Sequence, residues 1–228
     1  RAGVYLYSGD TVTDEDLFAF LDEFTGVRQD ELVQKMKWYL GEHPILDDPK
    51  RGGGRPDNRV IINLPYSNVD TFNGYFIGKN PKITLDNSGA NQSLQGWQDT
   101  NSFQDKLAEI SKQVDIYGHA FALIYQDEDS QTCMTYADPE NSFMIYDDTV
   151  QQKPLAFVTF SYDSEGSING MIYYAEGAYP FQNGVLSGEF YPNVYNRVPA
   201  VEFIANDERQ GLHDQGFAIA DHLGPAVT

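Results

Sequence analysis

The spacing of apolar residues changes once along this chain, at Gly118, and that change limits the folds open to it. Before Gly118, apolar side chains recur at intervals of three and four residues, which is the spacing of one face of an α-helix. After Gly118, apolar and polar residues alternate, as they do in strands with one buried face. The chain is therefore predicted to be an α+β protein, with N-terminal helices packed on an antiparallel multi-stranded meander.

Capping residues and glycines mark the predicted helix ends. Thr13 and Ser102 are predicted N-caps, because a hydroxyl at that position accepts a hydrogen bond from a free backbone amide. Gly26, Gly41 and Gly118 are predicted stops, since glycine readily takes the left-handed conformation that ends a helix. The predicted helices cover residues 13–25, 30–40, 58–76, where Pro65 kinks the helix or starts a new one, and 102–117.

The apolar faces of these helices are expected to point toward the protein interior, because they follow the helical spacing. The side chains expected on the inward faces are Leu17, Phe20, Leu21 and Phe24; Leu32, Met36, Tyr39 and Leu40; Ile61, Leu64, Phe72, Tyr75 and Phe76; and Leu107, Ile110 and Val114.

Seven strands are predicted beyond Gly118, separated by clusters of Asp, Asn, Ser and Gly. These residues favour turns because they bond to nearby backbone or tolerate positive φ. The predicted strands cover residues 120–126, 132–136, 143–146, 155–162, 168–174, 190–195 and 201–204. Before Gly118, a short strand is predicted at 83–85, followed by a polar stretch at 86–101. Residues 47–57 contain three consecutive glycines and no large apolar group, so a mobile loop is predicted there.

The charge of the chain is strongly negative and unevenly distributed. Its 34 acidic and 15 basic residues give a formal net charge of -19. Residues 1–118 hold 12 basic and 18 acidic residues, a net of -6, whereas residues 119–228 hold 3 basic and 16 acidic residues, a net of -13. Such a surface repels phosphate and anionic lipid, which argues against a protein that grips nucleic acid or a membrane.

Cysteine and hydropathy usage suggest where the protein is made. The single cysteine, Cys133, permits no intrachain disulfide and fits a reducing compartment. Cys133 lies in a predicted strand without a basic sequence neighbour, so a buried, inert thiol is expected. No apolar run approaches the roughly 20 residues that a membrane span needs, and no signal peptide opens the chain. A soluble protein made in a cytoplasm is expected.

Catalytic, cofactor-binding and metal-binding patterns were sought, and none is predicted. The glycines at 52–54 and at 78 lack the residues of a phosphate-binding loop, and the four histidines have no ligand spacing to a cysteine. Two acidic clusters, at 127–129 and 147–148, are interpreted as turns. One enzymatic alternative is an acidic carbohydrate hydrolase that uses Asp147 or Asp148 with Glu140, which requires two carboxylates across a cleft.

Five segments resemble segments of the portal proteins of tailed bacteriophages and occur in the same order as in that family. The portal proteins are of the type found in siphophages and in prophages of Gram-positive hosts. The segments are WYLGEHPIL at 38–46, NLPYSNVDTFNGYFIGKNPKI at 63–83, ISKQVDIYGHAFALIYQDEDS at 110–130, DPENSFMIYDDTVQQKPLAFV at 138–158, and RVPAVEF at 197–203 with NDERQG at 206–211. No one of them is decisive, but five in the order of the family make coincidence an inadequate explanation.

The resemblance implies a structural subunit without enzymatic activity or cofactor. Portal proteins are ring-forming, usually dodecameric conduits at the capsid vertex, through which DNA is packaged and ejected. The expected partners are further copies of the chain, the capsid or scaffold protein, the terminase and the head-tail adaptor. DNA would pass through the ring without tight binding by this part. The expected location is the virion, after assembly in the cytoplasm of the host.

The resemblance also implies a division of the chain. Residues 1–57 are expected to form an N-terminal helical segment with the glycine loop, residues 58–211 a wing-like α+β domain, and residues 212–228 an unassigned tail or fragment end. The stem, clip and crown helices of a portal protein are expected outside this sequence. A second alternative keeps the phage assignment but makes the chain a different head or tail adaptor protein.

Overall fold

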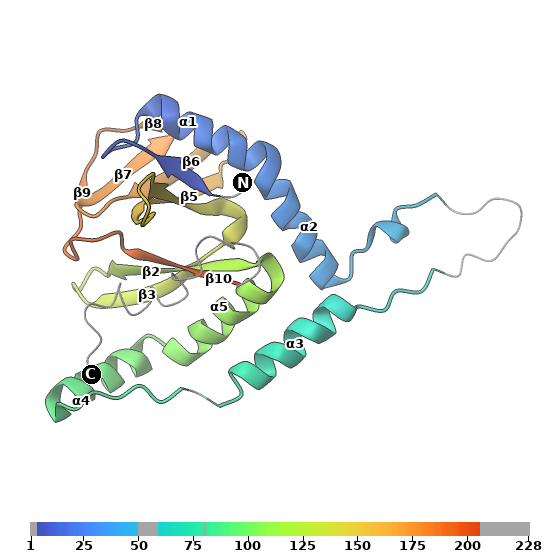
Figure 1. Cartoon of the computed structure of the whole chain (residues 1–228), viewed down its shortest axis with the longest axis horizontal. Helices are drawn as coiled ribbons and strands as arrows, with labels where there is room; N and C mark the ends of the chain where they lie inside the picture. Colours follow the sequence, from blue (N-terminus) through green and yellow to red (C-terminus); the bar gives the residue numbers. More distant parts are fainter. Residues whose placement is uncertain (1–3, 50–58, 80, 206–228) are drawn as a thin grey trace, which may run out of the picture.

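The computed structural model describes residues 4–49, 59–79 and 81–205, and it confirms the α+β class (Figure 1). The helices are α1 (Asp14–Glu23), α2 (Gln29–Leu40), α3 (Leu64–Phe76), α4 (Ser88–Thr100) and α5 (Phe103–Tyr117). The strands are β1 (Tyr5–Tyr7), β2 (His119–Gln126), β3 (Thr132–Ala137), β4 (Ser142–Asp147), β5 (Pro154–Tyr162), β6 (Ile168–Tyr173), β7 (Gly177–Gln182), β8 (Val185–Leu186), β9 (Tyr191–Pro192) and β10 (Ala200–Ile204). The predicted helix-to-strand change at Gly118 is confirmed, and Gly118 ends α5 with φ +88°.

The strands form two sheets. The larger has the order β1-β4-β5-β6-β7-β8, with β9 also paired to β7, and the smaller has the order β10-β2-β3. All pairs are antiparallel except β1 with β4, which is parallel. The meander prediction therefore holds for β4 to β8. Beside this meander, β1 adds a parallel edge strand, and β10, β2 and β3 form a separate sheet.

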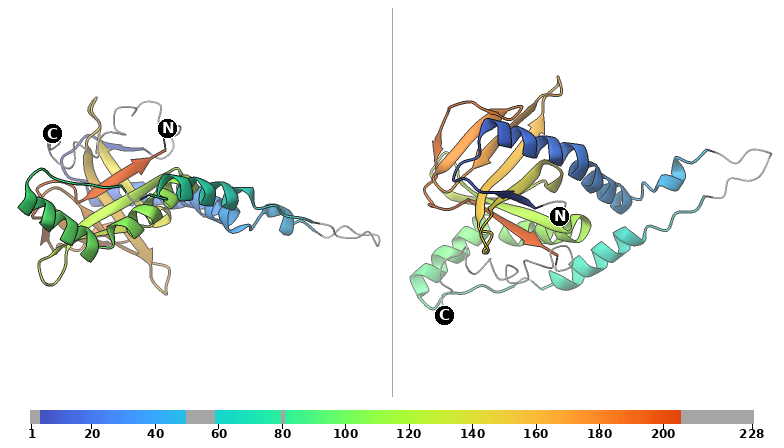
Figure 2. Two further views of the ribbon diagram at one scale, coloured as in Figure 1. Left: turned by 90° about the horizontal axis from the view of Figure 1, so that it is seen from below. Right: turned by 45° about the horizontal axis from the view of Figure 1, so that its top comes forward.

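Four layers result from the alternation of side chains along the strands (Figure 1). Phe143 and Ile145 of β4 face the cluster that contains Leu17 and Leu21 of α1, whereas Met144 and Tyr146 face the smaller sheet. In the smaller sheet, Phe121 faces β4, and its neighbours Ala120 and Ala122 face Ile110 of α5. The order is thus α1 and α2, larger sheet, smaller sheet, then α4 and α5, which lie across the smaller sheet in the view from below (Figure 2).

Gly26 does not end the first helix, contrary to the prediction. Helix α1 continues through a π-helical turn, Phe24–Arg28, directly into α2. Leu32 of α2 is fully buried in the same cluster as Leu21 of α1, so continuing the helix buries more apolar surface than stopping it would. A glycine inside a helix costs only about 0.5–1 kcal/mol, which this burial offsets. The Thr13 cap is confirmed by the bond from the Asp16 amide to Thr13 Oγ1, 3.2 Å long.

Helix α4 replaces the predicted polar stretch and the short strand before it. Residues 81–85 are extended but unpaired, and α4 begins at Ser88, after Asn87 as N-cap, whose side chain accepts a bond from the Ala90 amide. Trp97 docks α4 on the smaller sheet by donating from Nε1 to the Thr132 carbonyl, 2.7 Å away. Ser102 precedes α5 as expected, but its side chain makes no capping bond, because it has a left-handed backbone with φ +48°. Contacts made by a few side chains therefore determine the structure of residues 81–102.

Three strands were not predicted, and one was predicted too long. Strands β1, β7 and β8 have no counterpart in the prediction, and the strand expected at 190–195 is reduced to β9. Within β7, Gly177 and Pro180 interrupt the apolar alternation. Gly177 is required there because a Cβ would lie 2.2 Å from the Phe190 ring. Most of the predicted loop, 50–57, and the tail, 212–228, lie outside the described residues; the division at 57 and 211 stays a prediction.

Candidate assembly surface

The acidic clusters close hairpins and do not form a cleft. Asp147 Oδ1 accepts from the amides of Thr149 and Lys153, at 3.3 and 2.9 Å, and Asp127 Oδ1 accepts in the same way from Asp129 and Gln131, at 3.0 and 2.8 Å. These bonds are those of residues that stabilise a turn. The turn interpretation of both clusters therefore fits the structure.

Glu140 lies far from Asp147 and Asp148. It precedes β4, whereas Asp147 is the last residue of β4 and Asp148 follows it, and β4 spans roughly 17 Å at 3.3–3.4 Å per residue. Paired glycosidase carboxylates are about 5–9.5 Å apart. Glu140 Oε1 also accepts from the Tyr117 hydroxyl at 2.8 Å, and burial together with this bond raises the pKa of Tyr117. The hydrolase alternative is therefore wrong for this carboxylate pair.

Two further titratable groups play structural parts. His119 Nδ1 lies 3.1 Å from Glu202 Oε1, and Tyr146 donates to the other oxygen of Glu202, so this buried cluster joins β2, β10 and β4 across the two sheets. Cys133 is half-buried, not fully buried as expected. Partial desolvation and the carboxylate of Asp127 raise the pKa of its thiol, which keeps it protonated and unreactive. Within the described ranges, no group of three or more His, Cys, Asp or Glu side chains is arranged to hold a metal ion.

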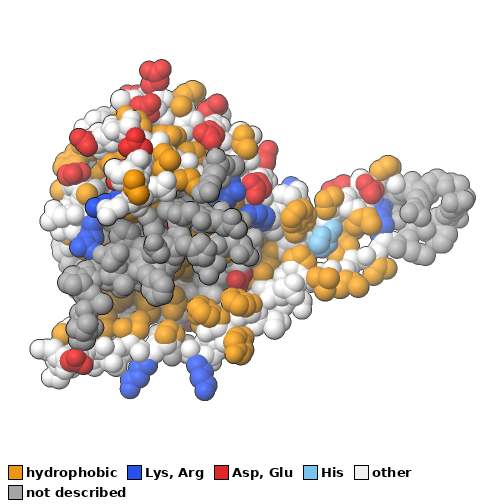
Figure 3. Space-filling model, viewed as in Figure 1, with side chains coloured by type: hydrophobic (Ala, Val, Ile, Leu, Met, Phe, Trp, Pro, Cys, Tyr) orange, Lys and Arg blue, Asp and Glu red, His pale blue; other side chains and the backbone are white. Residues whose placement is uncertain are grey.

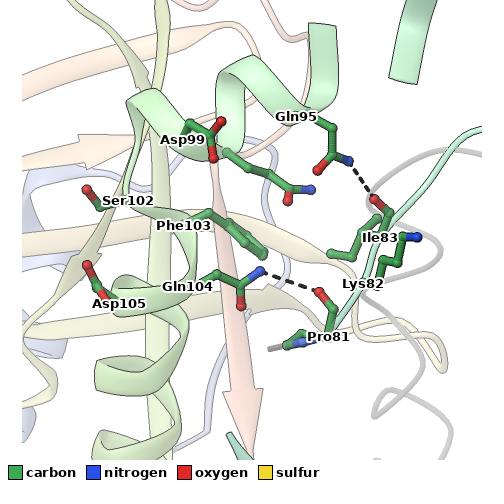
Figure 4. Close-up of a pocket in the computed structure, with 10 residues that line it drawn as sticks. Pro81, Lys82, Ile83, Gln95, Asp99, Ser102, Phe103, Gln104 and Asp105 are labelled. Atoms are coloured by element: carbon green, nitrogen blue, oxygen red, sulfur yellow. Dashed lines mark hydrogen bonds between the residues drawn. The ribbon is translucent and has the colours of Figure 1, made fainter. Parts of the chain in front are cut away.

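The polar side chains that line one cavity hold a backbone segment in place. It encloses about 440 Å³ between residues 81–83 and helices α4 and α5 (Figure 4). Gln95 Nε2 donates to the Ile83 carbonyl at 2.8 Å, and Gln104 Nε2 donates to the Pro81 carbonyl at 3.4 Å. These bonds explain how residues 81–85 stay extended without a strand partner. A second cavity, of about 510 Å³, lies between α2, α5 and Glu140, next to the Tyr117 bond already described.

A projection made of an outgoing and a returning segment is the most unusual feature of the molecule. We call residues 38–49 and 59–64 the arm; they leave the body at the end of α2 and return to it at the start of α3 (Figure 1). Gly41 turns the chain out of α2 with φ +84°, and a 3-10 turn, Pro44–Leu46, follows it. Asn63 caps α3 through a bond from the Tyr66 amide.

Hydrogen bonds tie the outgoing and returning parts of the arm together. Arg59 Nη1 donates to the carbonyls of Ile45, Leu46 and Asp48 at 3.0, 2.8 and 2.8 Å. Asn63 Nδ2 donates to the Tyr39 carbonyl at 2.9 Å. The arm is thus an organised element whose backbone bonds are made within the chain.

The outer side of the arm is apolar. Along the returning part, Arg59, Ile61 and Asn63 are partly buried, whereas Val60, Ile62 and Leu64 are 78%, 72% and 60% exposed. Seven of the 18 arm residues are large exposed hydrophobics: Trp38, Leu40, Ile45, Leu46, Val60, Ile62 and Leu64. Figure 3 shows this concentration along the projection. Soluble monomers rarely expose a contiguous apolar surface of this kind, so it marks an interaction site.

Several side chains expected inside the protein lie on this surface or beside it. Leu40 and Leu64 are 59% and 60% exposed, and on α3 Phe72, Tyr75 and Phe76 are 53%, 89% and 62% exposed. Their prediction as inward-facing residues is wrong for the single chain. Among the described side chains of α3 only Val69 is buried, because the helix packs mainly along α5 and the end of α2.

A groove lies at the other end of the molecule, between β2, β6, β7 and β9. Its volume is about 200 Å³. We call it the tyrosine groove, and its lining comprises Ile124, Tyr125, Gln126, Met171, Tyr173, Tyr174, Gly177, Ala178, Tyr191, Pro192, Asn193, Val194, Tyr195 and Pro199. None of these residues carries a charge at neutral pH, in a chain with 34 acidic residues. Sequence alternation had not singled the groove out, because its lining comes from four separate strands and their connections.

One comparison with known proteins identifies a family for this chain. The family model described as phage portal protein, SPP1 Gp6-like, matches residues 28–223, which include α2, the arm, helices α3 to α5 and strands β2 to β10. No curated protein matches the chain. Among the described residues, no helix is both long and apolar enough to cross a membrane.

Proposed function

This chain belongs to the SPP1 Gp6-like family of phage portal proteins, and from that premise we propose that it is the outer, wing-like part of a subunit of a portal ring. The family is a structural component of the phage, without enzymatic activity, and membership implies assembly into an oligomeric ring at the capsid vertex. In the proposal, the ring is a dodecamer that serves as the conduit for DNA packaging and ejection. The wing holds the ring in the capsid, and stem helices outside this sequence surround the DNA.

The exposed arm is the observation that carries this proposal. A ring subunit needs contact surfaces that are exposed in the single chain and covered in the assembly. The arm has seven large exposed hydrophobics, and its backbone is already held by Arg59 and Asn63. A pre-organised apolar surface loses little conformational entropy on binding, which favours its use as a contact. The hairpin aspartates offer no comparable site, since they are bonded within their own turns.

The same proposal assigns the partners by surface chemistry. Capsid or scaffold protein, terminase and head-tail adaptor are proposed as further partners of the complete ring, following the resemblance of the sequence. DNA is proposed to pass without tight binding, because only three of the 110 residues after Gly118 are basic. The family match favours a portal subunit over another head or tail adaptor.

Self-association tests the proposal. The chain would be examined at about 100 µM, where a contact worth about −5.5 kcal/mol is half-populated, by light scattering after size exclusion and by negative-stain electron microscopy. We expect assemblies larger than a dimer, with rings among them. A strictly monomeric chain at that concentration would contradict the proposal.

A matched pair of variants connects the assembly to the arm. Val60→Ser with Ile62→Ser removes two exposed aliphatic side chains from the arm, whereas Val27→Ser with Val150→Ser removes two exposed valines elsewhere. Exposed substitutions of this kind change the free energy of unfolding by about 0.5 kcal/mol or less per site. We expect the first pair to shift the chain toward monomer and the second to leave the assembly as it is. Equal effects of the two pairs on self-association would show that assembly does not depend on the arm.

A further inference from the structure

We propose that the arm of each copy binds in the tyrosine groove of the next copy, so that one repeated contact between two different surfaces closes the ring. The inference rests on the proposed ring-forming function and specifies which surfaces meet. The family match does not supply this assignment, because it gives neither the partner of the arm nor the occupant of the groove.

The arm and the groove lie at opposite ends of the molecule. In Figure 1 the arm projects at the right, and β9, whose residues line the groove, lies at the left. Both views in Figure 2, turned about the horizontal axis, keep the arm at the right, and the right-hand view keeps the strands around β9 at the left. A chain with two unlike contact surfaces at opposite ends joins head to tail, and such contacts produce a ring when the rotation between copies closes.

The two surfaces also match in chemistry. Copies of a chain with net charge -19 repel each other, so a stable contact has to use surface without like charges. The groove lining contains no charged residue, and the outward row of the arm, Val60, Ile62 and Leu64, is entirely aliphatic. The charged Arg59 of the same segment points instead to carbonyls within its own arm.

The size of the groove agrees with side chains as its occupant. At about 200 Å³ it is smaller than the roughly 300–1,000 Å³ typical of small-molecule sites. Protein contacts are commonly anchored by a few apolar side chains inserted among aromatic residues, with a more polar rim. The groove has tyrosines at its lining and the half-exposed Val194 at its edge, 58% exposed.

The reach of the arm is sufficient for a contact beyond its own body. The arm projects from the body beyond the end of α2 (Figure 1). The Arg59 bonds to the outgoing carbonyls tie its two parts together, so it is presented as one unit. Val60 and Ile62 of its aliphatic row precede α3 and are 78% and 72% exposed, so they are available to a neighbour.

Cysteine cross-linking tests the contact directly. In a Cys133→Ser background, which removes the single native thiol, Ile62→Cys is placed on the arm and Val194→Cys at the groove. Mild oxidation of the double variant is expected to give a ladder of covalent multimers on denaturing gels. A mixture of the two single variants is expected to stop at pairs, each containing one chain of each kind, because each chain then offers only one of the two partners.

The control is Ile62→Cys with Val150→Cys, since Val150 is fully exposed but lies outside the groove lining. The inference is overturned if this control gives an equal ladder, if Ile62→Cys alone pairs with itself as efficiently, or if the double variant gives no ladder. Electron microscopy of the same samples separates the two proposals. Rings without the arm-to-groove ladder overturn the inference and leave the proposed function standing, whereas a chain that stays monomeric contradicts the proposed function itself.

A second variant reports on the groove without oxidation. Val194→Glu introduces a carboxylate at the edge of the uncharged lining, and Val150→Glu adds the same charge elsewhere. We expect Val194→Glu to weaken self-association about tenfold, because it brings an unpaired carboxylate into an uncharged contact, and Val150→Glu to change it much less. Both side chains are exposed, so circular dichroism is expected to show the same fold for both variants. Equal weakening by the two variants would overturn the assignment of the groove.

Discussion

Helices α1 and α3 both have the spacing of a helix with one apolar face, yet one is inside the molecule and the other is on its surface. Leu17 and Leu21 of α1 are 0% and 2% exposed, whereas Tyr75 and Phe76 of α3 are 89% and 62% exposed. The difference lies in what stands opposite. Helix α1 meets the inward faces of β4 and β5, but α3 packs mainly along other helices. Apolar spacing shows that a face needs burial; it does not show which chain buries it.

The largest expected contrast between the two kinds of apolar surface comes from phenylalanines. Phe157 is fully buried between the sheets, with its ring 5.2 Å from that of Phe121, whereas Phe72 of α3 is 53% exposed. Phe157→Ala is expected to lower the free energy of unfolding by about 3–5 kcal/mol, because it leaves a cavity that the neighbours cannot fill. Phe72→Ala is expected to lower it by about 1 kcal/mol or less. Urea unfolding of both variants checks the contrast, and similar losses would mean that α3 is packed as firmly as the body.

The same contrast recurs within α5, at a smaller scale. Ile110 is 2% exposed and contacts Ala120, Ala122 and Met134, whereas Leu107, also predicted to be buried, is only half-buried. Ile110→Ala is expected to destabilise the chain by about 2–5 kcal/mol. Leu107→Ala should cost roughly half as much, because less of its surface leaves water on folding. Thermal unfolding at matched concentration distinguishes the two, and a larger loss at Leu107 would show that α5 is rotated from its described position.

The body was the more predictable of the two regions, for a physical reason. The alternation along β4 fixes which residues face α1 and which face the second sheet. The opposite orientations of Phe143 and Met144 can therefore be predicted from the sequence. Leu17 and Leu21 likewise show their buried face by their spacing. Both patterns are local, because burial on one side of a regular element imposes its period on the sequence.

The features that were missed depend on single side-chain contacts or on other copies. Helix α4 is polar, and its docking relies on one bond from Trp97 to the Thr132 carbonyl, which no periodicity reveals. Gly26 looked like a helix stop because the burial of Leu32 beyond it is a tertiary effect. For the candidate site, the exposure of Leu40 and Leu64 could not be anticipated, since apolar residues meant for a neighbour have the same spacing as those of a core.

The body and the arm should differ in their sensitivity to acid. The amides of Ser167 and Glu165 donate to Asp163 Oδ1 at 2.9 Å each and hold the pKa of this carboxyl below 3.8, its ordinary value. A carboxyl with a lowered folded pKa stabilises the fold above its unfolded pKa, and that contribution is lost as the pH falls through the folded pKa. The arm relies on the guanidinium of Arg59, which stays protonated throughout.

Asp163→Asn should therefore lower the melting temperature at neutral pH and reduce its further fall below about pH 3.8. Glu165→Gln removes the same charge from the same turn and serves as the control, because the interaction with Asp163 involves the backbone of Glu165 and not its carboxylate. Melting curves between about pH 7 and pH 3 make the measurement. An acid dependence that is unchanged in Asp163→Asn would show that this turn contributes nothing to acid sensitivity.

Duplex DNA should bind neither region well, which makes this the smallest expected effect. After Gly118 the basic residues are Lys153, Arg197 and Arg209, against 16 acids, and a protein that neutralises several phosphates needs clustered cations. Near the arm, the sequence places Lys50, Arg51 and Arg55 among Asp47, Asp48 and Asp57, which partly cancel their charge. At about 150 mM salt the dissociation constant is expected to be about 10⁻⁴ M or weaker, the weak end of non-specific binding. An anisotropy titration measures it, and deletion of residues 47–57 serves as the internal comparison. Sub-micromolar binding with a steep salt slope that is lost on this deletion would contradict the expectation. It would show that the arm contacts DNA and not a neighbouring subunit, because only a local cluster of cations could overcome the negative charge of the body.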